Sequence, residues 1–168
     1  MIFKNSINFK IKSRLFKIKN IKLSDISNNY INSLNSSKYL RYKKKYSILS
    51  QKKYIKKIKE SSNNCIVGIY FKEELIGTMN SQVHKFIKIW NKRLKNAISF
   101  GILIFNNYQN KKIGANSIKH YSKFLSKSYA NIFSTIHKNN KNSVKVFLNS
   151  GFKKINFKSN NTQFFFYR

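Results

Sequence analysis

Residues 101–115 read GILIFNNYQNKKIGA, an apolar run followed by a polar segment with one glycine near its end. The apolar run has no alternation, which predicts a central strand over Ala97–Phe105 that is buried on both faces. The polar residues predict a loop that leads into a helix from Ile113. A helix N-terminus offers free N–H groups and the positive end of its dipole to an anion such as pyrophosphate. Gly114 would let the backbone approach that anion closely, although many joints of this kind bind nothing.

Working outward, apolar periodicity and capping residues predict the order β-α-α-β-β-β-α-β-α-β-β, without internal repeats or a domain boundary, so residues 1–168 are expected to form a single domain. The first half begins with a predicted strand Arg14–Lys22 and a helix capped by Ser24 or Asp25, with Ile26, Tyr30 and Leu34 on one face. An irregular segment Ser37–Leu49 follows, and then a helix capped by Ser50 with Tyr54, Ile55 and Ile58 inward. A hairpin of Cys65–Phe71 and Leu75–His84 ends this half. The second half begins with a predicted loop through Trp90, the strand Ala97–Phe105 and a helix Ile113–Lys127. A strand Ile132–His137 and a helix Asn142–Ser150, ended by Gly151, come next. The last two strands, Phe152–Phe157 and Gln163–Tyr167, are joined by a turn at Ser159–Asn161.

Charge is the second informative feature of the chain. It has 35 Lys and Arg against 4 Asp and Glu in 168 residues, a formal net charge of +31. A surface this basic attracts phosphates, which would suit a nucleic-acid-binding domain. Lys, Asn and Ile contribute 31, 24 and 23 residues, however, and their codons consist almost wholly of A and T. We therefore attribute the charge mainly to an AT-rich genome and do not expect a nucleic-acid partner.

The remaining composition bounds the setting of the protein. Cys65 is the only cysteine, so no internal disulfide can form and a reduced, cytoplasmic location is expected. The three histidines, His84, His120 and His137, lack the spacing of a zinc cluster, so no metal is expected. The first 20 residues have no signal-peptide core, and the longest apolar stretch, Ile98–Phe105, is too short to span a membrane.

A second motif lies 25 residues beyond the first, in Asn139–Phe152, NNKNSVKVFLNSGF. Together the two motifs resemble those of the GNAT acetyltransferases, whose phosphate loop reads Gln/Arg-x-x-Gly-x-Gly/Ala and whose later segment reads Asn-x-x-Ser, an aromatic residue four positions on, and Gly-Phe. The matching residues occur in the correct order and spacing: Gln109, Gly114, Asn140, Ser143, Phe147 and the pair Gly151 and Phe152. The resemblance covers about residues 18–157 and agrees with the predicted order of elements.

The resemblance implies an α/β (α+β) fold whose mixed, mostly antiparallel sheet is flanked by helices and splays apart between two parallel strands, with acetyl-CoA wedged in the opening. It implies that the cofactor contacts backbone groups of the central strand at Ile102, Leu103 and Ile104, the phosphate loop of Gln109, Asn110, Lys111, Lys112, Ile113, Gly114 and Ala115, and the later motif at Asn140, Ser143 and Phe147. The chain would then be an enzyme that transfers an acetyl group to an amine.

Three residues depart from the family pattern. Lys112 occupies the place of the first loop glycine, so the backbone there is either right-handed or distorted. Phe147 replaces the usual tyrosine and has no hydroxyl with which to protonate the departing thiolate. Ser99 stands where many relatives carry a glutamate that accepts the proton of the amine, and none of the four carboxylates is an obvious replacement.

His84 is the candidate general base, because its ordinary pKa of about 6.5 suits proton transfer at neutral pH. The alternative is that His84 only ends a strand; His137 is a weaker candidate, and a positioned neutral amine needs little help from a base. The segment Ile21–Ile26 and the wide spacing of the later motifs look most like the subgroup of the family that acetylates amino-sugar nucleotides or ribosomal protein N-termini. The resemblance therefore implies an amino-sugar nucleotide or a protein N-terminus as the acceptor, bound near Ser37–Leu49 and the predicted loop Phe86–Asn96. A homodimer is compatible with this interpretation. A nucleic-acid-binding domain and an inactive binding protein with the same fold are the alternatives.

Overall fold

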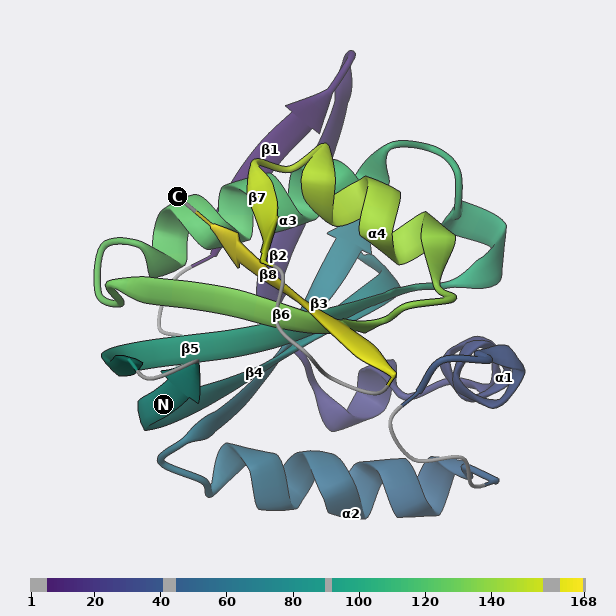
Figure 1. The fold of residues 1–168 in the computed structure, drawn as a ribbon. Helices are drawn as coiled ribbons and strands as arrows, with labels where there is room; N and C mark the ends of the chain where they lie inside the picture. The colour runs from purple at the N-terminus through teal and green to yellow at the C-terminus, as the bar shows by residue number, and fades with distance from the viewer. Residues whose placement is uncertain (1–5, 41–44, 90–91, 156–160, 168) are drawn as a thin grey trace.

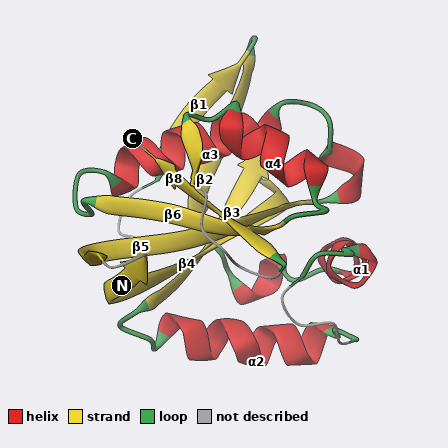
Figure 2. Ribbon diagram, in the orientation of Figure 1, coloured by secondary structure: helices red, strands yellow, loops and turns green. Residues whose placement is uncertain are grey.

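The computed structural model describes residues 6–40, 45–89, 92–155 and 161–167. These residues form one eight-stranded sheet, with strands in the order β1-β2-β3-β4-β5-β6-β8-β7, and four α-helices (Figures 1 and 2). The strands are β1 Ile7–Ile11, β2 Arg14–Asn20, β3 Asn64–Phe71, β4 Glu74–Ile89, β5 Lys92–Ile104, β6 Asn131–His137, β7 Phe152–Ile155 and β8 Thr162–Tyr167. The helices are α1 Asn28–Ser36, α2 Ile48–Lys59, α3 Ile113–Leu125 and α4 Lys141–Leu148, with short 3-10 turns η1 Leu23–Asp25 and η2 Asn106–Tyr108.

Helices cover both faces of the sheet, as Figure 1 shows: α3 and α4 lie on one side, α1 and α2 on the other. The larger core cluster packs the face of the sheet that carries Ile98 and Phe100 against α3 and α4. A second cluster packs the opposite face, including Ile66, against Tyr30 of α1 and Ile55 of α2. This arrangement confirms the predicted α+β fold with a mixed, mostly antiparallel sheet. None of the helices in the described segments is long and apolar enough to cross a membrane.

The N-terminal hairpin is the main feature that the sequence prediction missed. Strand β1 pairs antiparallel with β2, and the turn between them holds Lys12 at φ 54°. The alternation of Ile7, Phe9 and Ile11 with polar residues is the signal for this strand. The hairpin projects beyond α3 in Figure 1, and Phe9 stacks on His120 of that helix with ring centroids 5.1 Å apart.

The predicted loop Phe86–Asn96 was wrong, because β4 and β5 continue as a two-stranded ribbon with pairs such as Phe86–Lys95 and Lys88–Arg93. The guanidinium of Arg93 lies 3.6 Å from the centroid of the Phe86 ring. A ribbon in solvent needs no apolar alternation, so its sequence does not look like a strand. Trp90 lies outside the described residues.

Two helix caps were also predicted at the wrong residues. Asp25 belongs to η1, where its carboxylate accepts hydrogen bonds from the Lys22 backbone and the Tyr70 hydroxyl, and Ser27 caps α1 instead. Ser47, rather than Ser50, caps α2, and Ser50 completes a reciprocal capping box with it. Polar residues that stand close together in sequence compete for the cap, and only tertiary contacts decide between them. Gly151 has φ 91°, which confirms the left-handed turn after α4.

Other boundaries differ slightly. Strand β2 ends at Asn20, α3 ends at Leu125 and α4 spans Lys141–Leu148. Tyr54 is 40% exposed, so it does not belong to the inward face of α2, whereas Ile55 is fully buried. Strand β7 is described as far as Ile155; the rest of its predicted range and most of the predicted turn Ser159–Asn161 lie outside the described residues.

Candidate active site

The sheet opens between its two parallel neighbours, β5 and β6. These strands pair only at Ala97–Asn131, Ile98–Ile132 and Ser99–Phe133. Beyond Ser99, β5 stays paired with β4 as far as Ile104, and β6 stays paired with β8 as far as His137. The two strands therefore diverge after the Ser99–Phe133 pair, as predicted. The facing edges of residues 100–104 and 134–137 leave backbone polar groups for a ligand to pair with.

The closed end of this opening holds His84, the candidate general base, and Ser99, which stands where relatives carry a glutamate. Nε2 of His84 on β4 lies 2.9 Å from Oγ of Ser99 on β5, at hydrogen-bonding distance. The His84 ring also packs against Phe133 of β6, with ring centroids 5.3 Å apart. Three adjacent strands thus contribute one side chain each to a cluster beside the last paired residues of β5 and β6. Phe133 was not predicted as part of the site, because its position follows from the register of β5 against β6.

Partial burial sets the protonation of His84. Removal of water from the ring lowers the pKa of His84 below its ordinary value of about 6.5. The imidazole is therefore neutral at pH 7 and able to accept a proton. The Ser99 hydroxyl can donate to Nε2 or accept from it, according to the tautomer. The pair has the chemistry of a general base held by a hydroxyl.

The loop after β5 ends in an open helix N-terminus. Ser27, Ser47 and Asn140 cap α1, α2 and α4 through their side chains, whereas α3 begins after Lys112 without a side-chain cap. The first-turn N–H groups of a helix have no partners within it, so those of α3 are available to an anion. A Cβ at Gly114 would lie 3.5 Å from the nearest atoms of Ile104 and Val146, an ordinary contact. The protein itself therefore does not require glycine at this position.

The backbone of this loop is left-handed at two residues. Lys112 has φ 60° and ψ 3°, and Asn110 has φ 61°. Lys112 thus adopts a backbone conformation typical of glycine although it carries a side chain. Of the two alternatives that its sequence left open, a right-handed or a distorted backbone, the right-handed one is wrong. The expected cost is about 1–2 kcal/mol, which the rest of the fold must offset.

We expect Lys112→Gly to stabilise the protein by about 0.5–1 kcal/mol, because the gain from relieved strain exceeds the extra entropy of glycine in the unfolded chain. In a domain of this size that corresponds to a rise of roughly 1–4 °C in Tm, measurable by differential scanning calorimetry. Lys111→Gly is the matched control, since Lys111 has no positive φ and the change should lower Tm. Equal shifts in the two variants would contradict the interpretation.

Gln109 and Lys111 are already engaged within the loop. The Gln109 side chain donates to the Ile104 carbonyl at 3.0 Å and to Oδ1 of Asn106 at 3.2 Å, so it joins the end of β5 to the loop. The Lys111 ammonium donates to the Asn107 carbonyl at 2.8 Å. These bonds hold the loop in shape, and both side chains are exposed at its surface.

The later motif forms the N-terminal half of α4. Asn140 caps this helix, with Oδ1 accepting from the Ser143 backbone at 3.1 Å, and both residues are half-buried. Phe147 is 2% exposed and lies in the core against Phe100 and Phe152, at ring distances of 5.7 and 5.0 Å. Its side chain therefore packs the helix onto the sheet. The Ser150 hydroxyl donates to the Ala115 carbonyl at 3.0 Å, which ties α4 to the first turn of α3.

The segment after α1 reaches across to the other side of the opening. The Tyr39 hydroxyl donates to the Asn139 carbonyl at 3.0 Å, and its ring lies 5.4 Å from that of His137. Nδ1 of His137 accepts from the Asn139 backbone at 3.2 Å, so His137 already helps to form the turn before α4. Part of the predicted acceptor segment Ser37–Leu49 thus meets the end of β6, although residues 41–44 lie outside the described chain.

The carboxylates of the described chain are used elsewhere. Asp25 is bonded within η1, Glu73 forms ion pairs with Lys17 and Lys19, and Glu74 accepts from the Tyr108 hydroxyl at 2.6 Å. The fourth, Glu60, is exposed at the end of α2. Across the described segments, His, Cys, Asp and Glu form no group of three that could hold a metal ion.

Solved structures share this architecture, the fold of the GNAT acetyltransferases. The GNAT domain of PAT from S. lividans superposes with a TM-score of 0.71 at 10% identity, over 96% of each chain. RimL, described as a ribosomal L7/L12 α-N-protein acetyltransferase and solved with coenzyme A, gives a TM-score of 0.73 at 10% identity, over 95% of this chain and 96% of its own. The aminoglycoside acetyltransferase AAC(6')-Ib, solved with coenzyme A and kanamycin, gives 0.69 at 13% identity, over 90% and 92%.

No protein-family model matches the chain. No curated protein matches its sequence either. At 10–13% identity these structures establish the fold of this chain and leave its activity to be argued from its own residues.

Proposed function

We propose that the protein is an acetyl-CoA-dependent N-acetyltransferase that acts on a primary amine. The observation that carries the proposal is the His84–Ser99 pair, 2.9 Å apart at the closed end of the β5–β6 opening. The uncapped N-terminus of α3 follows the other end of β5. A cofactor bound by its pyrophosphate at α3 and by its amides along the free edge of β5 would present its thioester toward this pair.

The chemistry assigned to the pair is proton transfer. Neutral His84 removes one proton from the ammonium of the acceptor, and the amine nitrogen attacks the thioester carbonyl carbon. The C–S bond then breaks, and the second proton of the nitrogen ends on the coenzyme A sulfur. Ser99 orients the imidazole through its hydrogen bond and does not itself need to titrate. A thiol of pKa about 8.5 is a good leaving group, so the absence of a hydroxyl at Phe147 does not prevent the reaction.

Electrostatics favours one class of acceptor. The chain carries +31 charges, and none of the carboxylates placed above lies in the cluster around His84. An acceptor with several positive charges would be repelled without carboxylates to pair with. The charge supports an amine whose remainder is neutral or anionic, such as a protein N-terminus or an amino-sugar nucleotide.

Isothermal titration and a thiol-release assay test the proposal together. We expect acetyl-CoA to bind with a stoichiometry of one, and free thiol to appear when a uridine diphosphate amino sugar or a peptide with a free N-terminus is added. Spermidine should be at least tenfold poorer in kcat/KM, and the difference should shrink as salt screens the charges.

The outcomes of the two assays distinguish the proposed enzyme from its alternatives. A folded protein that gives no heat with acetyl-CoA would refute the enzyme, whereas binding without turnover of any amine would identify an inactive protein of this fold. Preference for spermidine would refute the assigned acceptor class alone.

A further inference from the structure

Ser99 only orients the imidazole of His84 in the transfer proposed above, yet its hydroxyl is placed as a nucleophile. Its Oγ lies 2.9 Å from Nε2 of His84, a distance at which a hydroxyl can pass its proton to an imidazole base. In the tautomer that carries its proton on Nδ1, the neutral ring accepts the hydrogen bond from the serine. A hydroxyl beside such a base is the arrangement that activates serine for attack on an acyl carbon.

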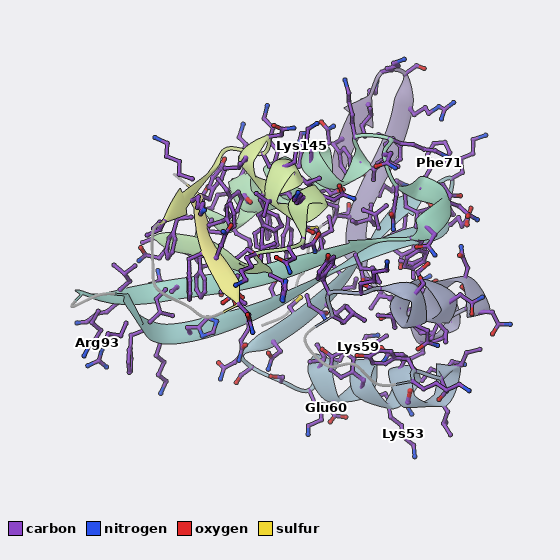
Figure 3. All side chains as sticks on the ribbon, turned by 45° about the vertical axis from the view of Figure 1, so that its right-hand side comes forward. Lys53, Lys59, Glu60, Phe71, Arg93 and Lys145 are labelled. Atoms are coloured by element: carbon purple, nitrogen blue, oxygen red, sulfur yellow. The ribbon has the colours of Figure 1, made fainter. Side chains whose placement is uncertain are left out.

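The imidazole of this pair is held by its surroundings. The Phe133 ring packs against it, with ring centroids 5.3 Å apart, and this contact restricts rotation of the side chain. No carboxylate takes part, because Asp25, Glu73 and Glu74 are bonded elsewhere and Glu60 stands at the exposed end of α2 (Figure 3). The pair therefore lacks the acid of a complete catalytic triad, and we expect its reaction to be slow.

Open space adjoins Ser99 on the same face of β5. Gly101 lies two residues further along the strand, so the two positions share a face of the sheet. Apart from its chain neighbours, a Cβ added at Gly101 would meet no atom of the described residues within 4 Å. Ser99 itself is only partly buried. There is therefore room beside the Ser99 hydroxyl for an acetyl group and for the water that removes it.

The free edge of β5 supplies the remaining parts of the site. Pairing with β6 ends at Ser99–Phe133, so the N–H groups of residues 100–104 that point toward β6 have no strand partner in the described chain. Such N–H groups stabilise the oxyanion that forms when an acyl carbon is attacked. From Ser99 to Ile104 the strand is about 17 Å long, a span that an extended pantetheine arm covers. A cofactor anchored at the N-terminus of α3 would thus bring its thioester to Ser99.

We propose that Ser99 is a nucleophile that attacks acetyl thioesters, so that the protein hydrolyses acetyl-CoA when no amine is bound. Oγ bonds to the carbonyl carbon while Nε2 of His84 takes the hydroxyl proton, and the C–S bond breaks as that proton passes to the sulfur. Water then gives a proton to the same nitrogen and attacks the ester, acetic acid is released, and the proton returns to Oγ. The acetyl-CoA half of this proposal rests on the function proposed above, whereas the Ser99–His84 pair needs no coenzyme A site.

Two substrates test the proposal: p-nitrophenyl acetate, which needs no coenzyme A site, and acetyl-CoA without an amine. We expect a stoichiometric burst of p-nitrophenol from the first and slow thiol release from the second. Ser99→Ala and His84→Gln should each lower both rates about 100-fold, and the double variant should be no slower than either, because nucleophile and base act as a unit. Ser126→Ala, which removes an exposed hydroxyl after α3, is the control and should change neither rate. Circular dichroism checks that each variant is folded.

Mass spectrometry after an acid quench locates the intermediate. We expect an acetyl group on the peptide that contains Ser99, and hydroxylamine should remove it, because hydroxylamine cleaves an ester and leaves acetylated lysines intact. Hydrolysis that persists in Ser99→Ala, or that never exceeds the rate of His84→Gln, would overturn the proposal. Hydrolysis without either a burst or an ester would overturn it too, and would leave Ser99 as a positioning residue. A burst and an ester from p-nitrophenyl acetate, with no heat on titration of acetyl-CoA, would support the pair and refute the function proposed above.

Discussion

Replacement of His84 by Ala or Gln is expected to lower kcat about 100-fold or more while acetyl-CoA still binds. General base catalysis contributes roughly 10²–10⁴-fold to a rate, and no carboxylate lies in the described cluster to take over the proton. His84→Gln is the sharper variant, because its amide can keep a hydrogen bond to Ser99 and so preserve the packing of the site. Steady-state thiol release with a fixed acceptor measures the effect.

The pH profile adds a readout that a merely structural histidine would not change. Burial lowers the pKa of His84, so the wild-type kcat/KM should rise with pH through a value below about 6.5 and then follow only the titration of the amine. In His84→Ala and His84→Gln, the rise of kcat/KM at low pH should be absent. His120→Gln on α3 is the matched control and should leave the profile unchanged. Full activity in His84→Gln would end the assignment and favour acetylation of a positioned neutral amine.

The fold was predictable because its decisive features are local. The continuous apolar run of β5 predicts a central strand, and the periodicity of Ile118, Tyr121 and Leu125 predicts the inward face of α3, where all three are buried. Strand β1 was missed although Ile7, Phe9 and Ile11 alternate with polar residues and Phe9 is buried in the core. The β4–β5 ribbon was missed because it projects from the sheet, where most of its side chains are polar or charged and exposed. A ribbon of this kind is stabilised by cross-strand hydrogen bonds, which apolar patterning does not reveal.

The candidate site was only partly predictable, since it depends on register. The sequence singled out His84 as a candidate base and Ser99 as a departure from the family pattern. Their contact arises because Gln82 pairs with Ser99, which places His84 diagonally beside Ser99. Phe133 joins them through the parallel pairing of β6. The backbone of Lys112 was not predictable either. Lysine favours negative φ angles, but the loop around Lys112 holds it at φ 60°.

Gly114→Ala should separate the demands of the ligand from those of the fold. An added Cβ meets Ile104 and Val146 at 3.5 Å, so no neighbour has to move, and alanine within a helix is favoured over glycine by about 0.5–1 kcal/mol. The Tm should therefore stay equal or rise slightly. If a pyrophosphate packs against this backbone, however, the methyl group blocks it, and the loss of one charge-assisted hydrogen bond of about 1.5–3 kcal/mol weakens acetyl-CoA binding at least tenfold.

The comparison of Tm with the dissociation constant for acetyl-CoA is what makes this variant decisive. Lys119→Ala is the control on α3, because this exposed residue lies away from the first turn of the helix, and it should leave both the Tm and the dissociation constant nearly unchanged. A Gly114→Ala protein that keeps both wild-type stability and wild-type affinity would place the pyrophosphate away from the first turn of α3. A variant that loses both would mean that the glycine serves the fold, although the 3.5 Å contacts that an added Cβ would make with Ile104 and Val146 are ordinary ones.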